Sequence, residues 1–506
     1  MPRKLINPGN EDDIRTAIDV IDNFRMESIF NQLAARPQRS IIILSLVLLL
    51  AGNWILPLTD RDEARFGEAS REMLQRGDYV VPWFNGEWRL YKPVMIYWCQ
   101  LASYHVLGVN DFAARLPSAL FAAGTALLLV RWGRKIADNR TGFMAGAMYV
   151  TGLHVGIIGR AATADLALIF FFTLATWSGW ELTRPVQPQR KRWWWIFYVA
   201  LALGFLTKGP EAWLPLGAMI LGRVLRKDSF RLPLGETAVG LCLAVALVGL
   251  WGIPALVQTG GKFWSFGMGD QVFKRAIAVK DRHGVTGILG FVVMLPLYFL
   301  TFFLSFFPWS IRVPQTLHRW WPERSRDDLG WYLLMVAALV FGVFSLVVTK
   351  LSHYTMPAFP CIALWLAWQI GRDSNVSIWF SRRLAVMVVF ILSVTLVGFP
   401  LLEKHLLTEN VWGALQGQVR PETRVGCFGY DEPSLVWRFR NVTTNRVTLD
   451  SVEQVKNFLT NPPPLIIVLP TKNLAQFQGL TGSQIQIHGF DMVKFKNWDL
   501  TAVLQP

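Results

Sequence analysis

Long apolar runs recur along most of this 506-residue chain, and they restrict its fold more than any other feature. A helix needs about 20 predominantly apolar residues to cross the hydrocarbon core of a bilayer. Several runs approach or exceed that length, the first from Ile41 to Pro57 and another at 113–130. The composition agrees, because 52% of the residues are hydrophobic and only 17% are charged. The sequence therefore predicts a mainly α-helical, polytopic membrane protein.

The basic residues lie in short clusters between the apolar runs. The formal net charge of +15 would also suit a nucleic-acid-binding protein, but clusters of this kind are typical of cytoplasmic loops. We therefore expect no nucleic-acid partner. Arg36 and Arg39 precede the first run, which predicts a cytoplasmic N-terminal segment. Further cytoplasmic clusters are expected at 131–140, 184–192, 223–231, 312–326 and 372–383.

Keeping all these clusters on one side of the membrane restricts the number of crossings. The segment 94–107 is then expected to lie in the outer interface, which leaves about 11 crossings. The run at 286–311 is long enough to contain a break, so the predicted count extends to about 13. The expected outer loops are 58–112, 159–165, 207–211, 257–285 and 349–354.

The chain changes character after Leu402, where polar and apolar residues mix. Val425–Tyr430 and Leu465–Leu469 are typical of short strands, and Ser451–Leu459 is typical of a helix capped by its first serine. These elements predict a small α/β domain. We therefore divide the chain into a cytoplasmic segment (1–39), a transmembrane domain (40–402) and a small external domain (403–506).

A group of carboxylates follows the first apolar run, in the stretch LTDRDEARFGEASREMLQRGD at 58–78. Apolar residues at helical spacing predict a helix from Asp62 to Gln75, and Gly77 is a suitable end. One interpretation is an amphipathic interfacial helix on which Glu68, Arg71 and other charges form a solvated, paired surface. That interpretation explains Asp62 less well, because Asp62 stands where the chain leaves the first run.

Ionisable residues also stand at the outer ends of other runs. Asp165 opens an apolar run, where a carboxylate is costly without a role, although helix capping is the alternative. Lys92 and Lys208 lie at outer edges, where reaching the lipid headgroups is the alternative. The expected loop at 257–285 is unusually basic for an outer loop, and contact with anionic lipid is its alternative.

These features together place carboxylates opposite several cations at the outer membrane edge. A base and an anion clamp suit transfer from a lipid phosphate, since the carboxylate activates the acceptor and the cations stabilise the departing phosphate. A secondary transporter or flippase of lipid-linked or anionic substrates is the alternative. It would place charged pairs near the bilayer midplane and contain two related halves. A lipid-binding scaffold, the third possibility, needs no base.

Several short motifs occur in a fixed order between roughly residues 40 and 370. They are DEARFGEASREM (62–73), YKPVMIYW (91–98), FAARLPSA (112–119), LGFLTKG (203–209) and KLSHYTMP (350–357). Through them the chain resembles bacterial GT-C glycosyltransferases related to protein O-mannosyltransferases, and in particular the lipid A aminoarabinose transferase branch. The stretch YDEPSLVW (430–437) is also similar to a segment of the C-terminal domain in some bacterial relatives.

This resemblance implies an inverting transfer of a sugar from undecaprenyl phosphate on the periplasmic face of the bacterial inner membrane. It leaves open which sugar is transferred and whether lipid A, another glycan or a protein is the acceptor. Asp62 matches the catalytic carboxylate of the family, and Asp165 matches its second acidic position. The residues that the resemblance implies for the donor phosphate are Lys92, Lys208, Arg275 and Tyr354.

The resemblance is incomplete at the metal site of the aminoarabinose branch. Two zinc-binding positions of that branch, a Glu and a His, correspond here to Tyr91 and Gln271. We therefore expect no dependence on zinc, whereas a divalent cation held by Asp165 and the lipid phosphate stays open. His283 and His353 are other candidate ligands, with ordinary hydrogen bonding as the alternative.

Overall fold

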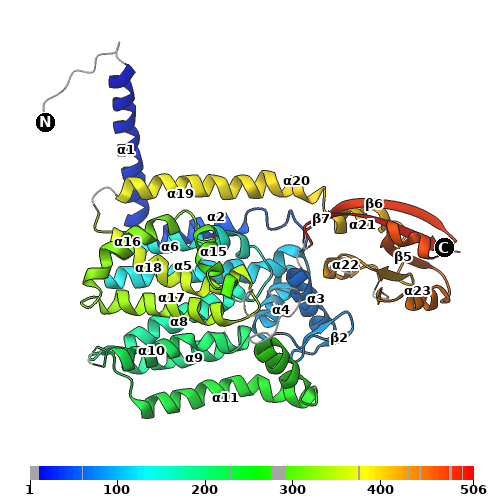
Figure 1. Ribbon diagram of the computed structural model, residues 1–506, viewed down its shortest axis with the longest axis horizontal. Helices are drawn as coiled ribbons and strands as arrows, with labels where there is room; N and C mark the ends of the chain where they lie inside the picture. Colours follow the sequence, from blue (N-terminus) through cyan, green and yellow to red (C-terminus); the bar gives the residue numbers. More distant parts are fainter. Residues whose placement is uncertain are drawn as a thin grey trace.

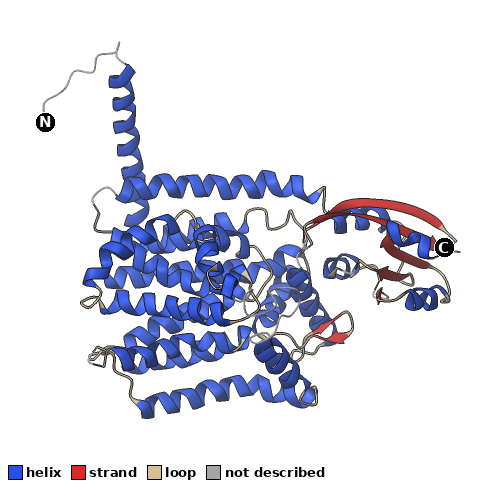
Figure 2. Ribbon diagram, in the orientation of Figure 1, coloured by secondary structure: helices blue, strands red, loops and turns tan. Residues whose placement is uncertain are grey.

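The computed structural model describes residues 11–59, 61–227, 229–274, 292–373, 376–430, 432–443, 446–477, 481–492 and 494–505. A large bundle of helices is followed by a small domain that contains a β-sheet (Figures 1 and 2). The long helices of the bundle run roughly parallel, with α11 along one edge and α19 along the opposite edge (Figure 1). The predicted fold class is therefore confirmed.

The first half of the bundle contains most of the loops in which site residues were expected. Its elements are α1 (Glu11–Ala35), α2 (Pro37–Leu50), α3 (Arg61–Arg76), β1 (Trp83–Phe84), β2 (Glu87–Trp88), α4 (Met95–Leu107), α5 (Asp111–Ile136), α6 (Asn139–Val150), α7 (Leu153–Ile158), α8 (Asp165–Thr183), α9 (Arg190–Lys208), η1 (Pro210–Trp213) and α10 (Leu214–Leu225).

The second half of the bundle contains the basic segment that begins after α11, and it ends on a long helical stretch. Its elements are α11 (Leu234–Gln258), α12 (Lys262–Trp264), η2 (Ser265–Lys274), α15 (Leu297–Ser305), η3 (Ser310–Arg312), α16 (Val313–Trp320), η4 (Trp321–Glu323), α17 (Asp328–Leu346), η5 (Ser352–Ala358), α18 (Phe359–Ile370), α19 (Val376–Ser393), η6 (Val394–Gly398) and α20 (Phe399–Glu403).

Within the described ranges, five helices are long and apolar enough to cross a membrane: α5, α8, α11, α17 and the stretch α19–α20. Seven result if two bent pairs each count as one span. One of these pairs, Val292–Ser305 with Ser310–Glu323, is bent by 118° and breaks the apolar run at 286–311. Other bundle helices, such as α6 and α18, have only 12 residues. The count of about 11 to 13 crossings therefore stays a prediction.

Burial separates interior helices from peripheral ones. Most of α8 is buried, whereas only 22% of the apolar stretch of α11 and 22% of that of α19–α20 is buried. Exposed apolar faces on long helices are typical of contact with lipid. These peripheral helices also lie at the two edges of the bundle (Figure 1), so lipid is expected to cover both edges.

Small residues let α5 and α6 approach closely. A Cβ atom on Gly142 would lie 2.5 Å from the carbonyl oxygen of Val130, and one on Gly146 would lie 2.9 Å from that of Ala126. Glycines four residues apart on one helix face are a common means of packing membrane helices with their backbones in contact. This contact holds α5, whose first turns carry residues of the candidate site.

The first apolar run does not form a helix along its whole length. Helix α2 ends at Leu50, and residues 51–59 form turns, so the predicted span from Ile41 to Pro57 is wrong at its end. The reason lies in α5, where Arg115 donates hydrogen bonds to the carbonyl oxygens of Leu56 and Pro57. These carbonyl oxygens accept hydrogen bonds from the Arg115 side chain, whereas in a helix they would accept them from backbone amides.

The helix expected at 62–75 is α3, and that expected at 94–107 is α4. Helix α3 ends before Gly77, whose φ of +67° is a conformation that glycine adopts readily. The charges of α3 are not a solvated surface, however. Glu68, Arg71 and Glu72 are only 2%, 5% and 6% exposed, so that interpretation is wrong.

Ion pairs and backbone contacts explain this burial. Arg71 pairs with Glu68 at 2.6 Å, and the Glu72 carboxylate accepts hydrogen bonds from the backbone amides of Asn85 and Gly86 in the turn between β1 and β2. Buried charges need partners of this kind. The polar face of α3 is therefore covered by protein, which amphipathic periodicity alone does not reveal.

The small domain is an α/β unit in which the strand order is β4-β3-β5-β7-β6. Strand β3 is parallel to β4 and β5, whereas β7 is antiparallel to β5 and β6. The two predicted strands are β3 and β5, and Ser451 caps α23 as predicted by accepting a hydrogen bond from the Gln454 amide. The elements are α21 (Leu407–Leu415), β3 (Arg424–Phe428), α22 (Pro433–Phe439), β4 (Arg446–Leu449), α23 (Val452–Leu459), β5 (Leu465–Pro470), η7 (Thr471–Gln476), β6 (Ser483–Asp491) and β7 (Lys496–Gln505).

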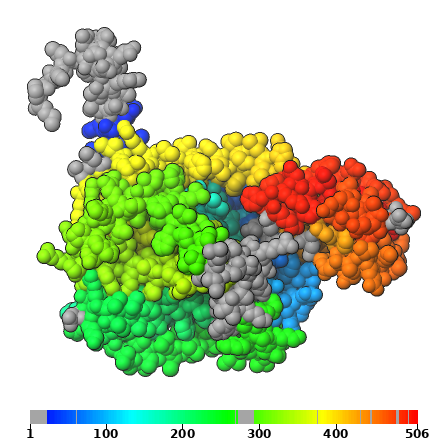
Figure 3. Space-filling model, in the orientation of Figure 1, coloured from blue at the N-terminus to red at the C-terminus, as the bar shows by residue number. Residues whose placement is uncertain are grey.

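The small domain forms a lobe at one end of the bundle, in orange and red in Figure 3. Helices α3 and α4 lie at the same end, and α1 lies at the other (Figure 1). Helix α22 packs against α3. The helix that begins with the candidate catalytic segment therefore lies between the bundle and the small domain.

Candidate functional site

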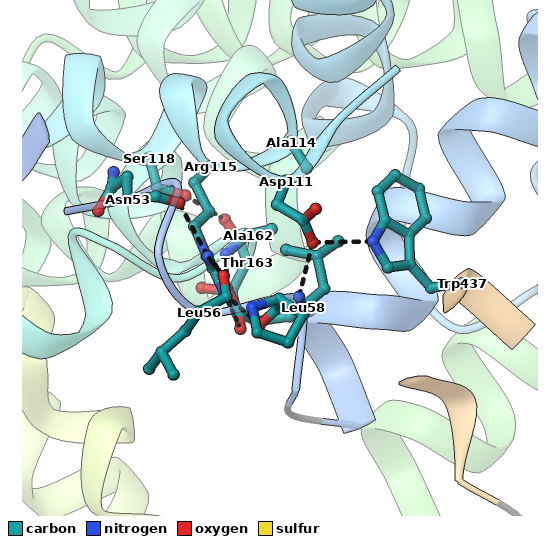
Figure 4. Close-up of polar contacts among 12 residues, drawn as sticks. Asn53, Leu56, Leu58, Asp111, Ala114, Arg115, Ser118, Ala162, Thr163 and Trp437 are labelled. Carbon is teal, nitrogen blue, oxygen red and sulfur yellow. Dashed lines mark hydrogen bonds and ion pairs between the residues drawn. The ribbon is translucent and has the colours of Figure 1, made fainter. Parts of the chain in front are cut away.

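An ion pair between Glu63 and Arg115 fixes the start of α3. Figure 4 shows the Arg115 side chain reaching the turn at Leu56. The guanidinium group donates to both carboxylate oxygens, with distances of 2.8 and 2.9 Å, and both side chains are at most 5% exposed. The Glu63 carboxylate also accepts a hydrogen bond from the Ala162 amide. One buried carboxylate therefore joins α3 to α5 and to the turn that precedes α8.

Arg115 uses its remaining donors on the turns after α2. It donates to the carbonyl oxygens of Asn53 at 3.0 Å and Pro57 at 2.8 Å, and to that of Leu56. All five guanidinium N–H groups are thus engaged. The path of the chain into α3 is fixed by these contacts.

Asp62 occupies the first turn of α3, next to Glu63, but its own side chain is exposed. It interacts electrostatically with Tyr97 on α4 and with His353 in η5. A carboxylate at a helix N-terminus is stabilised in its charged form by the helix dipole. Asp62 is therefore an accessible anion on a segment that its neighbours hold in place.

Asp165 and Lys208 form a second ion pair, although 43 positions separate them in the chain. Asp165 is the first residue of α8 and Lys208 is the last residue of α9, and their Oδ1 and Nζ atoms lie 2.7 Å apart. Both side chains are about nine-tenths buried. Glu211 approaches the same ammonium group to 3.5 Å. The charge of Lys208 is therefore shared between two carboxylates.

Residues of η5 complete this group. The Nζ atom of Lys208 lies 5.2 Å from the centre of the Tyr354 ring, a cation–π contact. The neighbouring His353 interacts electrostatically with Asp165, Lys208, Asp62 and Lys92. Burial lowers the pKa of His353 from its ordinary value, so its ring is neutral at pH 7. His353 thus lies among the acidic and basic candidates from four different segments.

Lys92 lies in a segment whose neighbours are firmly packed. Arg89 donates a hydrogen bond to the Tyr97 hydroxyl at 3.1 Å, and its guanidinium group lies 5.0 Å from the centre of the Phe66 ring. The rings of Tyr91 and Phe266 are 4.9 Å apart, which joins this segment to η2. The chain around Lys92 is therefore held against α3, α4 and the start of the basic segment.

The structure brings together five of the six site residues expected from the sequence. Asp165, Lys208 and Tyr354 are in direct contact, and Asp62 and Lys92 act electrostatically on His353. Arg275 and His283 lie outside the described residues.

The sequence assigned no role to Glu63 or Arg115, and it indicated His353 as a metal ligand or an ordinary hydrogen-bonding residue. Glu63 and Arg115 lie inside two of the motifs that carry the family resemblance. Their place in these motifs was the sign in the sequence that they belong to the site.

In the described part of the chain, no group of three or more His, Cys, Asp or Glu side chains is placed to hold a metal ion. Asp165, the expected cation ligand, is bound to Lys208. A divalent cation on Asp165 would therefore have to displace or share that contact, and the question of a cofactor stays open.

Comparisons with known proteins show what the whole chain is similar to. Residues 91–251 match the family model described as "Dolichyl-phosphate-mannose-protein mannosyltransferase". An uncharacterized protein of Aquifex aeolicus is 27% identical over 73% of this chain and 80% of its own length. The undecaprenyl phosphate-alpha-4-amino-4-deoxy-L-arabinose arabinosyl transferase of Pectobacterium carotovorum is 30% identical over 73% of this chain. The match spans 66% of that transferase, just under two thirds of its length.

A solved structure supports the same fold. ArnT from Cupriavidus metallidurans, in a crystal structure with undecaprenyl phosphate, is similar over 91% of this chain and 97% of its own, with a TM-score of 0.74 at 16% identity. In sequence and in fold the chain is therefore similar to integral membrane glycosyltransferases of the GT-C superfamily, among them the protein O-mannosyltransferases and the ArnT proteins.

Replacing Glu63 by Ala is expected to destabilise the fold. Arg115 would remain buried without its counter-charge, and breaking a buried ion pair by removing one partner costs about 3–5 kcal/mol. The unfolding temperature in detergent micelles, followed by tryptophan fluorescence, should therefore fall. Glu87→Ala is the control, because Glu87 is exposed. Equal unfolding temperatures for the two variants would contradict the role given to this pair.

Proposed function

We propose that this chain transfers a sugar from a polyprenyl-phosphate donor, undecaprenyl phosphate in bacteria, to a lipid, glycan or protein acceptor. The observation that carries the proposal is the group around His353. There an exposed carboxylate and two lysines from separate segments act on one ring. A base beside cations is the arrangement that a reaction with a phosphate leaving group requires.

The reaction is a single displacement with inversion at the anomeric carbon. Asp62 accepts the proton of the acceptor hydroxyl as its oxygen forms a bond to that carbon. The bond between the anomeric carbon and the phosphate oxygen breaks, and the electron pair leaves with undecaprenyl phosphate. Because Asp62 is exposed, an acceptor can approach it from outside the packed bundle.

Lysines stabilise the negative charge that the departing phosphate develops. Lys208 shares its charge with Asp165 and Glu211, so it contributes less than a full positive charge to a phosphate. The remaining positive charge for the phosphate comes from Lys92 and from the basic segment that begins at Lys262 and extends to Arg275. Tyr354 positions the ammonium group of Lys208 through its ring. Asp165 in turn keeps Lys208 charged and oriented.

The names of similar proteins agree with a lipid-linked donor. The Pectobacterium relative is named as an undecaprenyl phosphate aminoarabinose transferase, and the solved ArnT contains undecaprenyl phosphate. The replacement of two family zinc positions by Tyr91 and Gln271 argues for a donor or acceptor that differs from those of that branch.

A secondary transporter or flippase of lipid-linked or anionic substrates is the alternative function. It requires charged pairs near the bilayer midplane. Asp165 opens α8 and Lys208 closes α9, so this pair lies at helix ends. That position favours an enzyme at the membrane surface. A transporter would move the lipid-linked sugar without cleaving it.

Asp62→Asn tests the base directly. The amide preserves the shape of the side chain but cannot accept the proton, so transfer should fall by roughly 10²–10⁴-fold with donor binding retained. Purified protein in lipid nanodiscs would receive a labelled undecaprenyl-phosphate sugar and a membrane acceptor extract, and release of undecaprenyl phosphate would be measured. Asp60→Asn is the matched control and should stay active. An active Asp62→Asn enzyme with an inactive control would refute the assignment.

Lysine substitutions test the phosphate clamp. Lys92→Ala should lower kcat/KM for the donor by about 10²-fold. Lys208→Ala should lower kcat/KM and also the unfolding temperature, because it leaves the buried carboxylate of Asp165 unpaired. Lys404→Ala, an exposed lysine after α20, is the control. Normal donor use by both variants would refute the clamp.

The proposed location is the bacterial inner membrane, with the site on the periplasmic side. Five basic clusters fall on the cytoplasmic side only if the number of crossings is odd. A topology reporter after Pro506 should therefore be active in the periplasm, and one within 184–192 should be active in the cytoplasm. A cytoplasmic reporter at Pro506 would contradict both the topology and the shared face that the reaction needs.

A further inference from the structure

The small domain inserts one tryptophan into the bundle beside the candidate site. Trp437 on α22 is fully buried, in a cluster with Leu58, Ala64, Tyr104 and Ala113. These neighbours belong to the segment before α3, to α3 itself, to α4 and to α5 (Figure 4 shows the ring beside Leu58). The indole ring therefore packs where the elements around the first site segment meet.

The tryptophan also makes a specific polar contact. Its Nε1 atom donates a hydrogen bond of 2.9 Å to Oδ1 of Asp111, at the start of α5. The same oxygen accepts a hydrogen bond of 2.8 Å from the backbone amide of Leu58 (Figure 4). A single carboxylate oxygen thus links the small domain to the backbone of the segment that leads to Asp62.

This link adds to the contacts of Arg115 on the same segment. Arg115 holds the carbonyl groups of residues 53, 56 and 57, and Asp111 holds the next amide, that of Leu58. The side chain of Leu58 also lies so close to Gly67 on α3 that a Cβ atom there would be 2.5 Å from it. The segment is therefore fixed up to Leu58, and Asp62 follows in the first turn of the next helix.

A cation on the small domain supports the ring. The guanidinium group of Arg440 lies 3.7 Å from the centre of the Trp437 ring and interacts electrostatically with Asp111 and Glu68. Cation–π contacts of this kind stabilise an aromatic ring in one orientation. The docking of α22 is therefore both apolar and charge-complementary to α3 and α5.

We propose that Trp437 is a positioning residue for sugar transfer, acting through Asp111 and the Leu58 amide on the segment that carries Asp62. This inference rests on the proposed function, because it assigns Asp62 to the chemistry. The small domain is then part of the catalytic machinery, since its docking sets the orientation of the base. It does so without contact between Trp437 and the substrate.

Trp437→Phe separates the hydrogen bond from the packing, because phenylalanine fills most of the same space but has no N–H donor. A small displacement of a catalytic group lowers the rate strongly, so kcat should fall by about 10- to 100-fold. The KM for the donor should be unchanged, because Lys92 and Lys208 are not on this segment. Hydrogen exchange of the Leu58 amide, measured by mass spectrometry, should become faster.

Asp111 provides the conservative comparison. Asp111→Ala should reproduce the effects of Trp437→Phe, and the double variant should be little worse than Asp111→Ala, because both remove one shared contact. Asp111→Asn should retain most of the activity, since its amide oxygen still accepts both hydrogen bonds. Trp412→Phe is the matched control, because Trp412 packs on Phe439 within the small domain. Its kcat should be normal.

Several results would overturn the inference. The first is a normal kcat, or a normal rate of hydrogen exchange at the Leu58 amide, in Trp437→Phe. The second is a kcat that falls as far in Trp412→Phe as in Trp437→Phe. The third is a kcat that falls as far in Asp111→Asn as in Asp111→Ala. If the unaltered protein cleaves no lipid-linked sugar, the proposed function fails and the positioning role fails with it. The exchange measurement, which needs no activity, would then still report whether Trp437 holds Leu58.

Discussion

The ion pair of Glu63 and Arg115 determines how the end of this bundle beside the small domain is arranged. One guanidinium group joins the turns after α2, the first turn of α3 and the body of α5, and the paired carboxylate reaches the backbone at Ala162. Burying two charges is costly unless every donor and acceptor is used. Here all five donors of Arg115 are bonded. The pair therefore specifies one geometry for three regions that are distant in the sequence: the chain from the turns after α2 into α3, the start of α5, and the turn before α8.

This geometry separates buried charges, which hold segments together, from an exposed one. Glu63, Glu68 and Glu72 are buried and hold protein contacts, whereas Asp62, beside Glu63 in the chain, is exposed. The site is then assembled from the ends of helices: the start of α3, the start of α8, the end of α9 and the turn η5. The small domain adds Trp437 to the same arrangement. Charged groups at helix ends lie near the membrane surface, where a lipid-linked sugar presents its phosphate.

The sequence alone predicted the helical bundle, the strands β3 and β5 and the Ser451 cap, because each depends on local periodicity or a local hydrogen bond. It also indicated Asp165 and Lys208, since a charge at the end of an apolar run is conspicuous, whereas Tyr354 was implied by the family resemblance. It did not reveal that Asp165 and Lys208 pair directly, or that α2 ends at Leu50, because these depend on partners far along the chain. The burial of Glu68 was missed for the same reason: α22 and the β1–β2 turn cover a face that periodicity assigns to solvent.

The central claim is that the residues around His353 bind the phosphate of a lipid-linked sugar donor. The most direct measurement is an electron cryomicroscopy structure of the protein in lipid nanodiscs with undecaprenyl phosphate. The phosphate group is predicted to lie within ion-pair distance of Lys92 and Lys208, with the Asp62 carboxylate facing the side on which the sugar would be attached. A phosphate bound elsewhere on the protein, with Lys208 still engaged only by Asp165 and Glu211, would contradict the claim.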